Sequence, residues 1–302
     1  MESAHTRFVL EFSLVITAHK EEAPAFTAPP LSCDSHFHVF GLAERYSYGA
    51  DLRYKPPLAP LEDYLELARH LGCERFVFVQ PSAYGRDNTC MLDAMRAVGK
   101  KCRGIVDIDE SAPDTELEKL NAAGVRGVRV NVNPIKPLEA GFSKTMLPRI
   151  ERLDARCAEL GWMLDFLTPG WLTRELIPVM GKLKSRFTVA HMGMFLAKDG
   201  PRQPGFREFL DFLRGCERGW VKFTGTYRMS VAPGFADVAP MARALIDAVP
   251  DRIIWGSDYP HLSFADKVGS VELFNLLAEW APDAAMRKKI LVDNPQALFA
   301  FR

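Results

Sequence analysis

The sequence predicts an α/β protein folded as one (β/α)₈ barrel with an N-terminal extension. From residue 31 onward, short apolar runs alternate with amphipathic segments of helical length. The first run ends at His36-Phe37-His38, and Asp258 follows the last run more than two hundred residues later. A parallel sheet that closes on itself would bring these two distant stretches together.

Eight strands are expected, each a short run of apolar and β-branched or aromatic residues. In chain order they are 31–38, 75–80, 104–107, 127–131, 162–166, 187–190, 220–224 and 252–255. Residues two apart on a strand point the same way, so His36 and His38 can present both imidazoles to one cavity.

Eight helices are expected between and after these strands, where apolar residues recur at helical spacing. In chain order they are 61–71, 88–98, 114–123, 143–160, 172–183, 206–213, 236–249 and 271–280. Eight strand-helix units suffice to close a barrel. The alternative, an open doubly wound sheet, normally carries an early glycine-rich phosphate loop, and this sequence contains no such motif.

The composition favours one catalytic domain that acts on a small molecule. The 302 residues include no linker-like stretch, which favours a single catalytic domain. We expect an N-terminal extension, 1–30, followed by a barrel domain, 31–302. Lys+Arg and Asp+Glu are equal at 38 each, which argues against nucleic acid or an anionic membrane as a partner. The sequence leaves the oligomeric state open, a homo-oligomer included.

The six cysteines are scattered without a CxxC pair, and most lie in apolar segments. Free thiols in such segments commonly pack as small hydrophobic side chains. A reducing, cytoplasmic compartment is therefore expected.

Polar residues gather where the predicted strands end, which in a barrel is the face that carries the active site. They are His36, His38, Gln80, Asp107, Arg129, His191, Thr224 and Asp258. With His261, which follows the last strand, four histidines and a carboxylate on one face favour a catalytic site over isolated structural roles.

Several motifs give the chain a family resemblance. They include Asp34-Ser35-His36-Phe37-His38, Ala190-His191-Met192-Gly193 and Trp255-Gly256-Ser257-Asp258-Tyr259-Pro260-His261, with further matches around residues 79–88, 124–131 and 221–228. The chain from residue 31 onward resembles the amidohydrolase superfamily, and within it the 2-pyrone-4,6-dicarboxylate lactonase group. The resemblance implies a (β/α)₈ hydrolase that opens lactones from aromatic-acid degradation, commonly without a metal.

The chemistry of lactone opening suits these side chains. Asp258 is the natural general base for the attacking water. His36, His38 and His191 can donate hydrogen bonds to the developing oxyanion, where one preorganised donor contributes about 3 kcal/mol. This hypothesis requires no cofactor.

Two alternatives remain open at this stage. His36, His38, His191 and Asp258 could instead hold one divalent metal, most plausibly zinc, in a decarboxylase of the same superfamily. A third reading, of a different class, is a non-catalytic barrel that binds an organic acid.

Arginines indicate a carboxylated substrate, because guanidinium binds carboxylate in a bidentate manner. By resemblance, Arg129 and Arg228 match carboxylate-binding positions, and Arg126 is a third candidate although it lies on the opposite strand face from Arg129. Met194 stands where the resemblance leads us to expect another arginine, a gap that Arg86 could fill. Weaker candidates for substrate contacts are Tyr54, Gln80, Ser82 and Tyr84.

Overall fold

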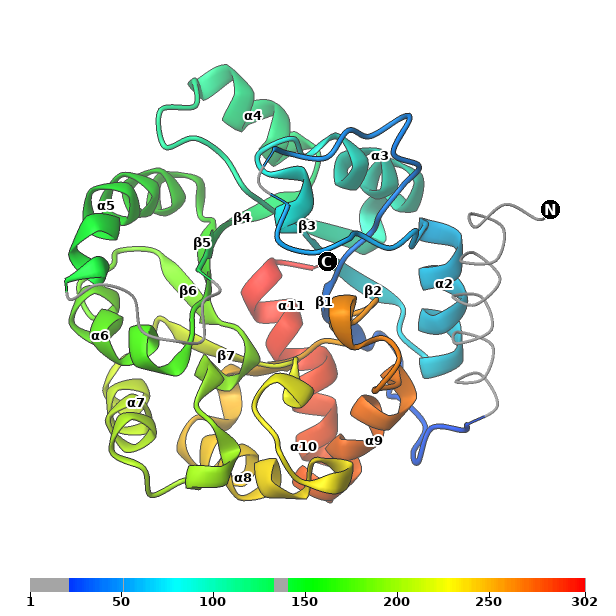
Figure 1. Cartoon of the computed structure of the whole chain (residues 1–302), viewed down its shortest axis with the longest axis vertical. Coiled ribbons are helices and arrows are strands. Elements are labelled where there is room, and N and C mark those ends of the chain that lie inside the picture. Colours follow the sequence, from blue (N-terminus) through cyan, green and yellow to red (C-terminus); the bar gives the residue numbers. More distant parts are fainter. Residues whose placement is uncertain (1–21, 51, 133–140, 302) are drawn as a thin grey trace.

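The computed structural model describes residues 22–50, 52–132 and 141–301. Eight parallel strands follow one another around a ring in chain order, and helices cover the outside (Figure 1). The strands are β1 (Cys33–Phe37), β2 (Arg75–Val79), β3 (Cys102–Val106), β4 (Val125–Asn131), β5 (Met163–Leu167), β6 (Arg186–Val189), β7 (Gly219–Phe223) and β8 (Ile253–Trp255). The predicted (β/α)₈ fold is confirmed, and every expected strand lies within two residues of its observed bounds.

The helices that follow the strands are amphipathic and bury one face against the sheet. They are α2 (Leu61–Leu71), α3 (Thr89–Val98), α4 (Asp114–Ala122), α5 (Phe142–Leu160), α6 (Gly170–Met180), α7 (Pro204–Gly215), α8 (Ala239–Ala248) and α9 (Ser270–Trp280). Helix α7 illustrates the pattern, because its buried residues recur at helical spacing: Phe206, Phe209, Leu210 and Leu213. Each of these helices matches its sequence prediction to within three residues.

The barrel closes where β1 meets the segment after β8. The backbone N–H of Asp258 donates to the carbonyl of His36 at 2.8 Å, and the N–H of His38 donates to the carbonyl of Tyr259, also at 2.8 Å. The expected meeting of the first and last strands is confirmed. Because the two bonds alternate across the junction, closure itself sets both histidines beside Asp258.

The C-terminal segment closes the opposite end of the barrel. Helices α10 (Ala284–Lys288) and α11 (Asn294–Phe299), joined by a π-helical turn, were not expected from the sequence. Arg103, near the start of β3, donates to the carbonyl of Phe299 and lies 4.5 Å from the ring centroid of Phe301. In Figure 1 α11 crosses the middle of the ring. The carboxyl end of the strands is therefore the end left for a site.

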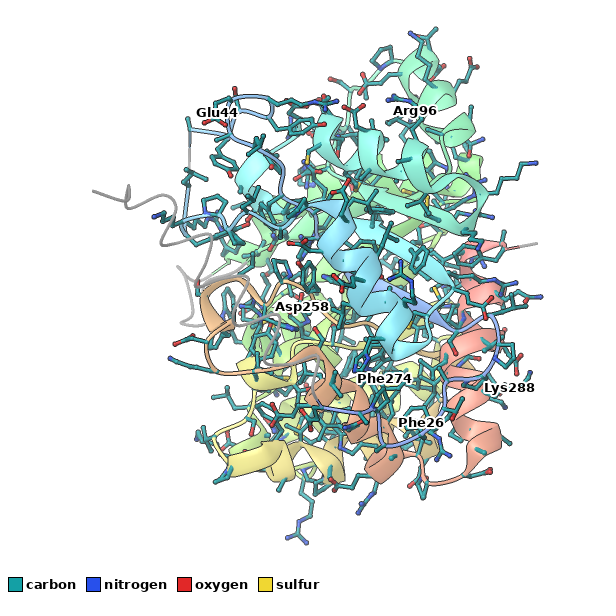
Figure 2. All side chains as sticks on the ribbon, turned by 90° about the vertical axis from the view of Figure 1, so that its right-hand side faces the viewer. Phe26, Glu44, Arg96, Asp258, Phe274 and Lys288 are labelled. Atoms are coloured by element: carbon teal, nitrogen blue, oxygen red, sulfur yellow. The ribbon has the colours of Figure 1, made fainter. Side chains whose placement is uncertain are left out.

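The described part of the N-terminal extension, residues 22–30, packs against the barrel. Phe26 stacks on Phe274 of α9 with ring centroids 4.5 Å apart, and Figure 2 shows the two side by side. The guanidinium of Arg287 lies 4.8 Å from the Phe26 ring centroid. Residues 1–21 lie outside the described ranges.

Two further observations bear on the sequence expectations. All six cysteines are buried and free, as expected for thiols that pack as hydrophobic side chains. Among the described residues, no helix combines the length and the apolar character needed to cross a membrane.

Candidate active site

A pocket opens at the carboxyl end of the barrel, bounded by loops that follow the strands. Three of the predicted catalytic residues, His38, His191 and Asp258, line it. The rest of the wall consists of Arg53, Tyr54, Pro81, Ser82, Arg129, Asn131, Leu167, Arg228, Leu262 and Ser263. The fold therefore gathers residues from most of the chain at one face, as a barrel active site requires.

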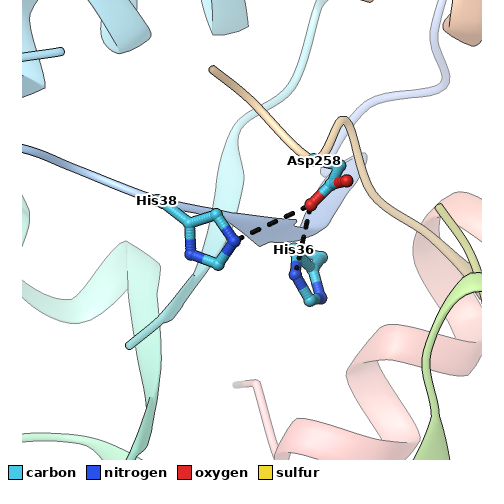
Figure 3. A group of neighbouring side chains, drawn as sticks. All are labelled: His36, His38 and Asp258. Carbon is cyan, nitrogen blue, oxygen red and sulfur yellow. Dashed lines mark ion pairs between the residues drawn. The ribbon is translucent and has the colours of Figure 1, made fainter. Parts of the chain in front are cut away.

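Asp258 lies at the centre of three imidazoles. Its Oδ1 is 3.5 Å from Nε2 of His36 and 3.7 Å from Nε2 of His38, and Figure 3 shows both contacts. Its Oδ2 is 3.7 Å from Nε2 of His191. All four side chains are buried, so these interactions are little screened by water.

Two neighbours on the loop after β7 hold the other side of the carboxylate. The hydroxyl of Tyr227 donates to Oδ2 of Asp258 at 2.6 Å, and Nε of Arg228 lies 3.6 Å from the same oxygen. Burial works against ionisation of Asp258, but the neighbouring imidazoles and the guanidinium of Arg228 outweigh it and hold its pKa well below the ordinary value. Asp258 is thus a carboxylate at neutral pH.

Tyr227 was missed by sequence reasoning. It sits beside Arg228, which was singled out, but nothing in its local pattern distinguishes it from a core tyrosine. Burial raises the pKa of Tyr227 well above its ordinary value, and the charge of Asp258 adds to that effect. The phenol therefore remains a hydrogen-bond donor.

Two glycines make room for the histidines. A Cβ at Gly256 would lie 2.6 Å from Cβ of His36, and one at Gly225 would lie 2.5 Å from Nδ1 of His191. Gly225 also has a φ of +57°, a region that other residues adopt at a cost. The glycine in the Trp-Gly-Ser-Asp motif is thus explained by close approach to the backbone and Cβ of His36.

The hydrogen bonds of the imidazoles differ from one another. Nδ1 of His38 lies 2.7 Å from the carbonyl oxygen of Val79, which can only accept, so the neutral ring carries its proton on Nδ1 and leaves Nε2 as an acceptor. Nδ1 of His191 faces the hydroxyl of Thr224 at 2.7 Å, a partner that can donate or accept. Burial lowers the pKa of His38, and lowers that of His191 to about 3. Both rings are neutral at pH 7.

Three side chains of the site are spaced closely enough to bind one metal ion. One ligand atom from each of His36, His38 and Asp258 lies within 4.8 Å of the others, and His38 presents a lone pair at Nε2. His36 does not fit, because its Nδ1 lies 3.4 Å from the ammonium of Lys222 instead of a hydrogen-bond acceptor. The side chains therefore match a zinc shell in spacing but not in hydrogen bonding.

Arg129, Arg228, Tyr54 and Ser82 line the pocket as expected, whereas Arg126 does not. Its Nη1 donates to the carbonyl and side-chain oxygens of Asn121, on the face of β4 opposite Arg129. The expectation of a substrate contact from Arg126 is corrected by the two-residue period of the strand.

Two other expected substrate contacts, Gln80 and Tyr84, lie outside the lining of this pocket. Gln80 donates from Nε2 to the carbonyls of Gly85 and Asp87 and so fixes the loop after β2. The Tyr84 hydroxyl accepts a hydrogen bond from the backbone N–H of Gly41. These two residues shape the wall from behind.

Arg86 likewise lies outside the pocket lining, and its guanidinium contacts other carboxylates. It forms an ion pair with Asp109 and lies 4.0 Å from a carboxylate oxygen of Asp107. It does not fill the place of the arginine expected at Met194, which is buried in a small apolar cluster with Leu167 and Ala190. Of this cluster, Leu167 lines the pocket.

The barrel and the imidazole-carboxylate cluster at its carboxyl end define the chain as a hydrolase-type (β/α)₈ protein. Residues 33–301 match the family model Amidohydro_2, described as amidohydrolase. The chain belongs to this family and is an enzyme of the hydrolase class, as the sequence predicted.

Two curated relatives and one solved structure are similar to this chain over most of its length. A 4-sulfomuconolactone hydrolase of Hydrogenophaga intermedia is 36% identical over 278 residues, covering 91% of this chain and 90% of that protein. A 2-pyrone-4,6-dicarboxylate hydrolase of Comamonas testosteroni is 34% identical over 286 residues, covering 91% and 92%. A ligand-free crystal structure from Agrobacterium tumefaciens superposes with a TM-score of 0.81 at 30% identity, covering 93% and 99%.

Proposed function

We propose that this enzyme hydrolyses a lactone that bears a carboxylate, of the kind formed in aromatic-acid degradation. The observation that carries the proposal is an ionised carboxylate, Asp258, in a pocket that also contains buried hydrogen-bond donors awaiting a partner. The names of the curated relatives support lactones as the substrate class.

Asp258 acts as the general base. It takes a proton from water as the water oxygen bonds to the lactone carbonyl carbon and the carbonyl oxygen becomes negative. When the tetrahedral intermediate collapses, the ring C–O bond breaks and the proton passes from Asp258 to the departing ring oxygen. The product is an open-chain acid.

The three imidazoles have different roles in the proposed reaction. His191 lines the pocket and His36 lies behind Asp258, and we assign both as N–H donors that stabilise negative charge. For His38 the expected donor role is revised, because its neutral ring presents an acceptor at Nε2. His38 and Asp258 together are suited to orient the attacking water.

The substrate carboxylate is held by the arginines. Nε of Arg129, Nε of Arg228 and the hydroxyl of Tyr54 are buried and have no hydrogen-bond partner among the described residues. Buried donors are costly to leave unpaired, so a bound anion that accepts from them gains affinity. Leu167 and Leu262 also line the pocket and favour an uncharged edge on the substrate.

The test is hydrolysis of 2-pyrone-4,6-dicarboxylate, followed by its ultraviolet absorbance with protein stripped by chelator and assayed for residual metal. A neutral lactone of similar ring size is the control substrate. Turnover of the carboxylated lactone alone supports the proposal. Turnover of neither lactone, with zinc-dependent decarboxylation of a related aromatic acid, would favour the metal-dependent decarboxylase instead.

A further inference from the structure

A buried ion pair lies inside the barrel, outside the lining of the pocket. Lys222 on β7 and Asp165 on β5 are both fully buried, and Nζ of Lys222 lies 2.7 Å from Oδ1 of Asp165. Thr188, on the strand between them, donates its hydroxyl to the same oxygen. A fully buried lysine is rare, and its loss of hydration is costly. This indicates a role beyond holding three strands together.

The ammonium of Lys222 lies beside a ring nitrogen of His36. Nζ of Lys222 lies 3.4 Å from Nδ1 of His36. A lysine ammonium has three N–H donors and no acceptor, so it can bond Nδ1 only if that nitrogen carries a lone pair. The neutral His36 ring must then carry its proton on Nε2, the atom that lies 3.5 Å from Oδ1 of Asp258.

We propose that Lys222 is a positioning residue that holds His36 in the Nε2–H tautomer, so that this imidazole donates toward Asp258 and the pocket and is withheld from a divalent cation. The site then contains two neutral histidines in opposite tautomers. His38 is fixed by an acceptor, the Val79 carbonyl, and His36 by a donor, Lys222.

The consequence for metal binding follows from the same contacts. A histidine that ligates a metal through Nε2 gives up that proton and usually donates Nδ1–H to a carbonyl or carboxylate. His38 has such support, whereas His36 faces a positive charge at the corresponding place. Lys222 thereby opposes metal binding by tautomer and by charge. This inference rests on the proposed function and deepens it, since it accounts for histidines that act as hydrogen-bonding groups instead of metal ligands.

The experiment reads the tautomer directly on the full chain. Protein labelled with ¹⁵N-histidine gives distinct ring-nitrogen NMR shifts for the two tautomers, and His36→Gln identifies the His36 signals. The decisive variant is Lys222→Met combined with Asp165→Asn, because removing one charge alone would strand its partner in the interior. Thr188→Val alone, which removes a hydrogen bond to Asp165 but keeps the ion pair with Lys222, is the matched control.

In the parent protein and in Thr188→Val, His36 is expected to show the Nε2–H pattern. In the double variant the Nδ1–H form is expected to become populated beside it, because only Asp258 then favours the Nε2–H form. Affinity for Zn²⁺, measured by competition with a chelating dye, is expected to rise at least about tenfold. An Nδ1–H pattern in the parent protein would overturn the proposal without any variant. So would an unchanged tautomer population in the double variant, or an equal change in Thr188→Val.

The lactone assay separates this inference from the proposed function. A parent protein that shows the expected tautomer but opens no lactone removes the proposed reaction and leaves the role of Lys222 standing. A parent protein that turns over lactone with His36 in the other tautomer does the reverse.

Discussion

Tyr227 donates its hydroxyl hydrogen to Oδ2 of Asp258 across 2.6 Å. The opposite oxygen of the same carboxylate faces His36 and His38. The phenol therefore fixes the carboxylate from the side away from β1 and leaves Oδ1 to the imidazoles. Because Tyr227 does not line the pocket, its contribution should appear in the chemical step instead of substrate binding.

Tyr227→Phe is expected to lower kcat about tenfold and leave KM nearly unchanged, because a hydrogen bond to a charged group contributes roughly 1.5–3 kcal/mol and part of that is orientation. Tyr259→Phe is the matched control. Tyr259 is also buried and follows Asp258 directly, but its hydroxyl has no hydrogen-bond partner among the described residues. Steady-state kinetics on the carboxylated lactone decide between them, and equal losses in both variants would contradict a specific role for Tyr227.

Asp258→Asn is expected to abolish general-base catalysis, with kcat lower by about a thousandfold, in the middle of the range for such groups. Asparagine tolerates the positive φ of 58° at this position, so the backbone should not move. Substrate binding, measured by calorimetry, should persist. Near-normal kcat would show that another group removes the proton.

The two arginines of β4 provide a test of anion binding within one strand. Arg129→Gln removes a guanidinium that lines the pocket and should raise KM for a carboxylated lactone about 10- to 100-fold. Arg126→Gln removes a guanidinium on the opposite face, bound to Asn121, and should leave KM unchanged. Thermal melting of both variants checks that folding is preserved. A similar KM in both would place the substrate anion elsewhere.

Gly225→Ala should damage the site through contact with His191, since the new methyl group would lie 2.5 Å from Nδ1. Gly234→Ala is the control for backbone strain. Gly234 has almost the same φ, +58° against +57°, but a Cβ there would meet no atom within 4 Å. We expect kcat/KM to fall at least about tenfold in Gly225→Ala only, with similar melting temperatures in both variants. A comparable loss of kcat/KM in Gly234→Ala would point to strain alone.

The sequence was sufficient for the repeated part of the fold, because each strand-helix unit carries its own hydrophobic period. It was not sufficient for α11, whose six residues follow a π-helical turn and show no separable period. In the site, strand-end position identified Asp258 and the histidines. Tyr227 and Lys222 escaped notice because their importance comes from contacts with residues far along the chain.

Arg126 and Gln80 show the complementary failure. Both are polar and lie on or beside strands, so composition alone made them candidates. The pleat turns Arg126 away from the pocket, and two backbone carbonyls engage the amide of Gln80. Which polar side chain is left for a ligand depends on its partners, and a single sequence does not specify them.

Asp34 gives a prediction about stability and pH. This carboxyl is buried beneath the β1–β8 junction, where it accepts hydrogen bonds from the backbone N–H groups of His36 and Ser257 and from the hydroxyl of Tyr64. Burial raises its pKa to about 6, although these hydrogen bonds oppose the shift. The native state therefore holds a proton between about pH 4 and 6 that the unfolded state has released.

Because the native state binds more protons in that range, the contribution of Asp34 to the free energy of unfolding falls as pH rises from about 4 to 6. The loss is about 3 kcal/mol for a shift of this size, at roughly 1.4 kcal/mol per pKa unit. The buried histidines act in the opposite direction, since burial lowers the pKa of His36, His38 and His191. Their contribution is common to the parent protein and an Asp34 variant.

Asp34→Asn should remove the Asp34 contribution and keep the geometry, since the amide oxygen can accept from both backbone N–H groups while the amide nitrogen donates to Tyr64. Urea unfolding of parent and variant at pH 4 and pH 7 measures the effect. The stability of the variant relative to the parent should increase by up to about 3 kcal/mol between these two pH values. A constant difference would mean that Asp34 titrates alike in the folded and unfolded chain, and that its charge is fully accommodated at the junction that places His36 beside Asp258.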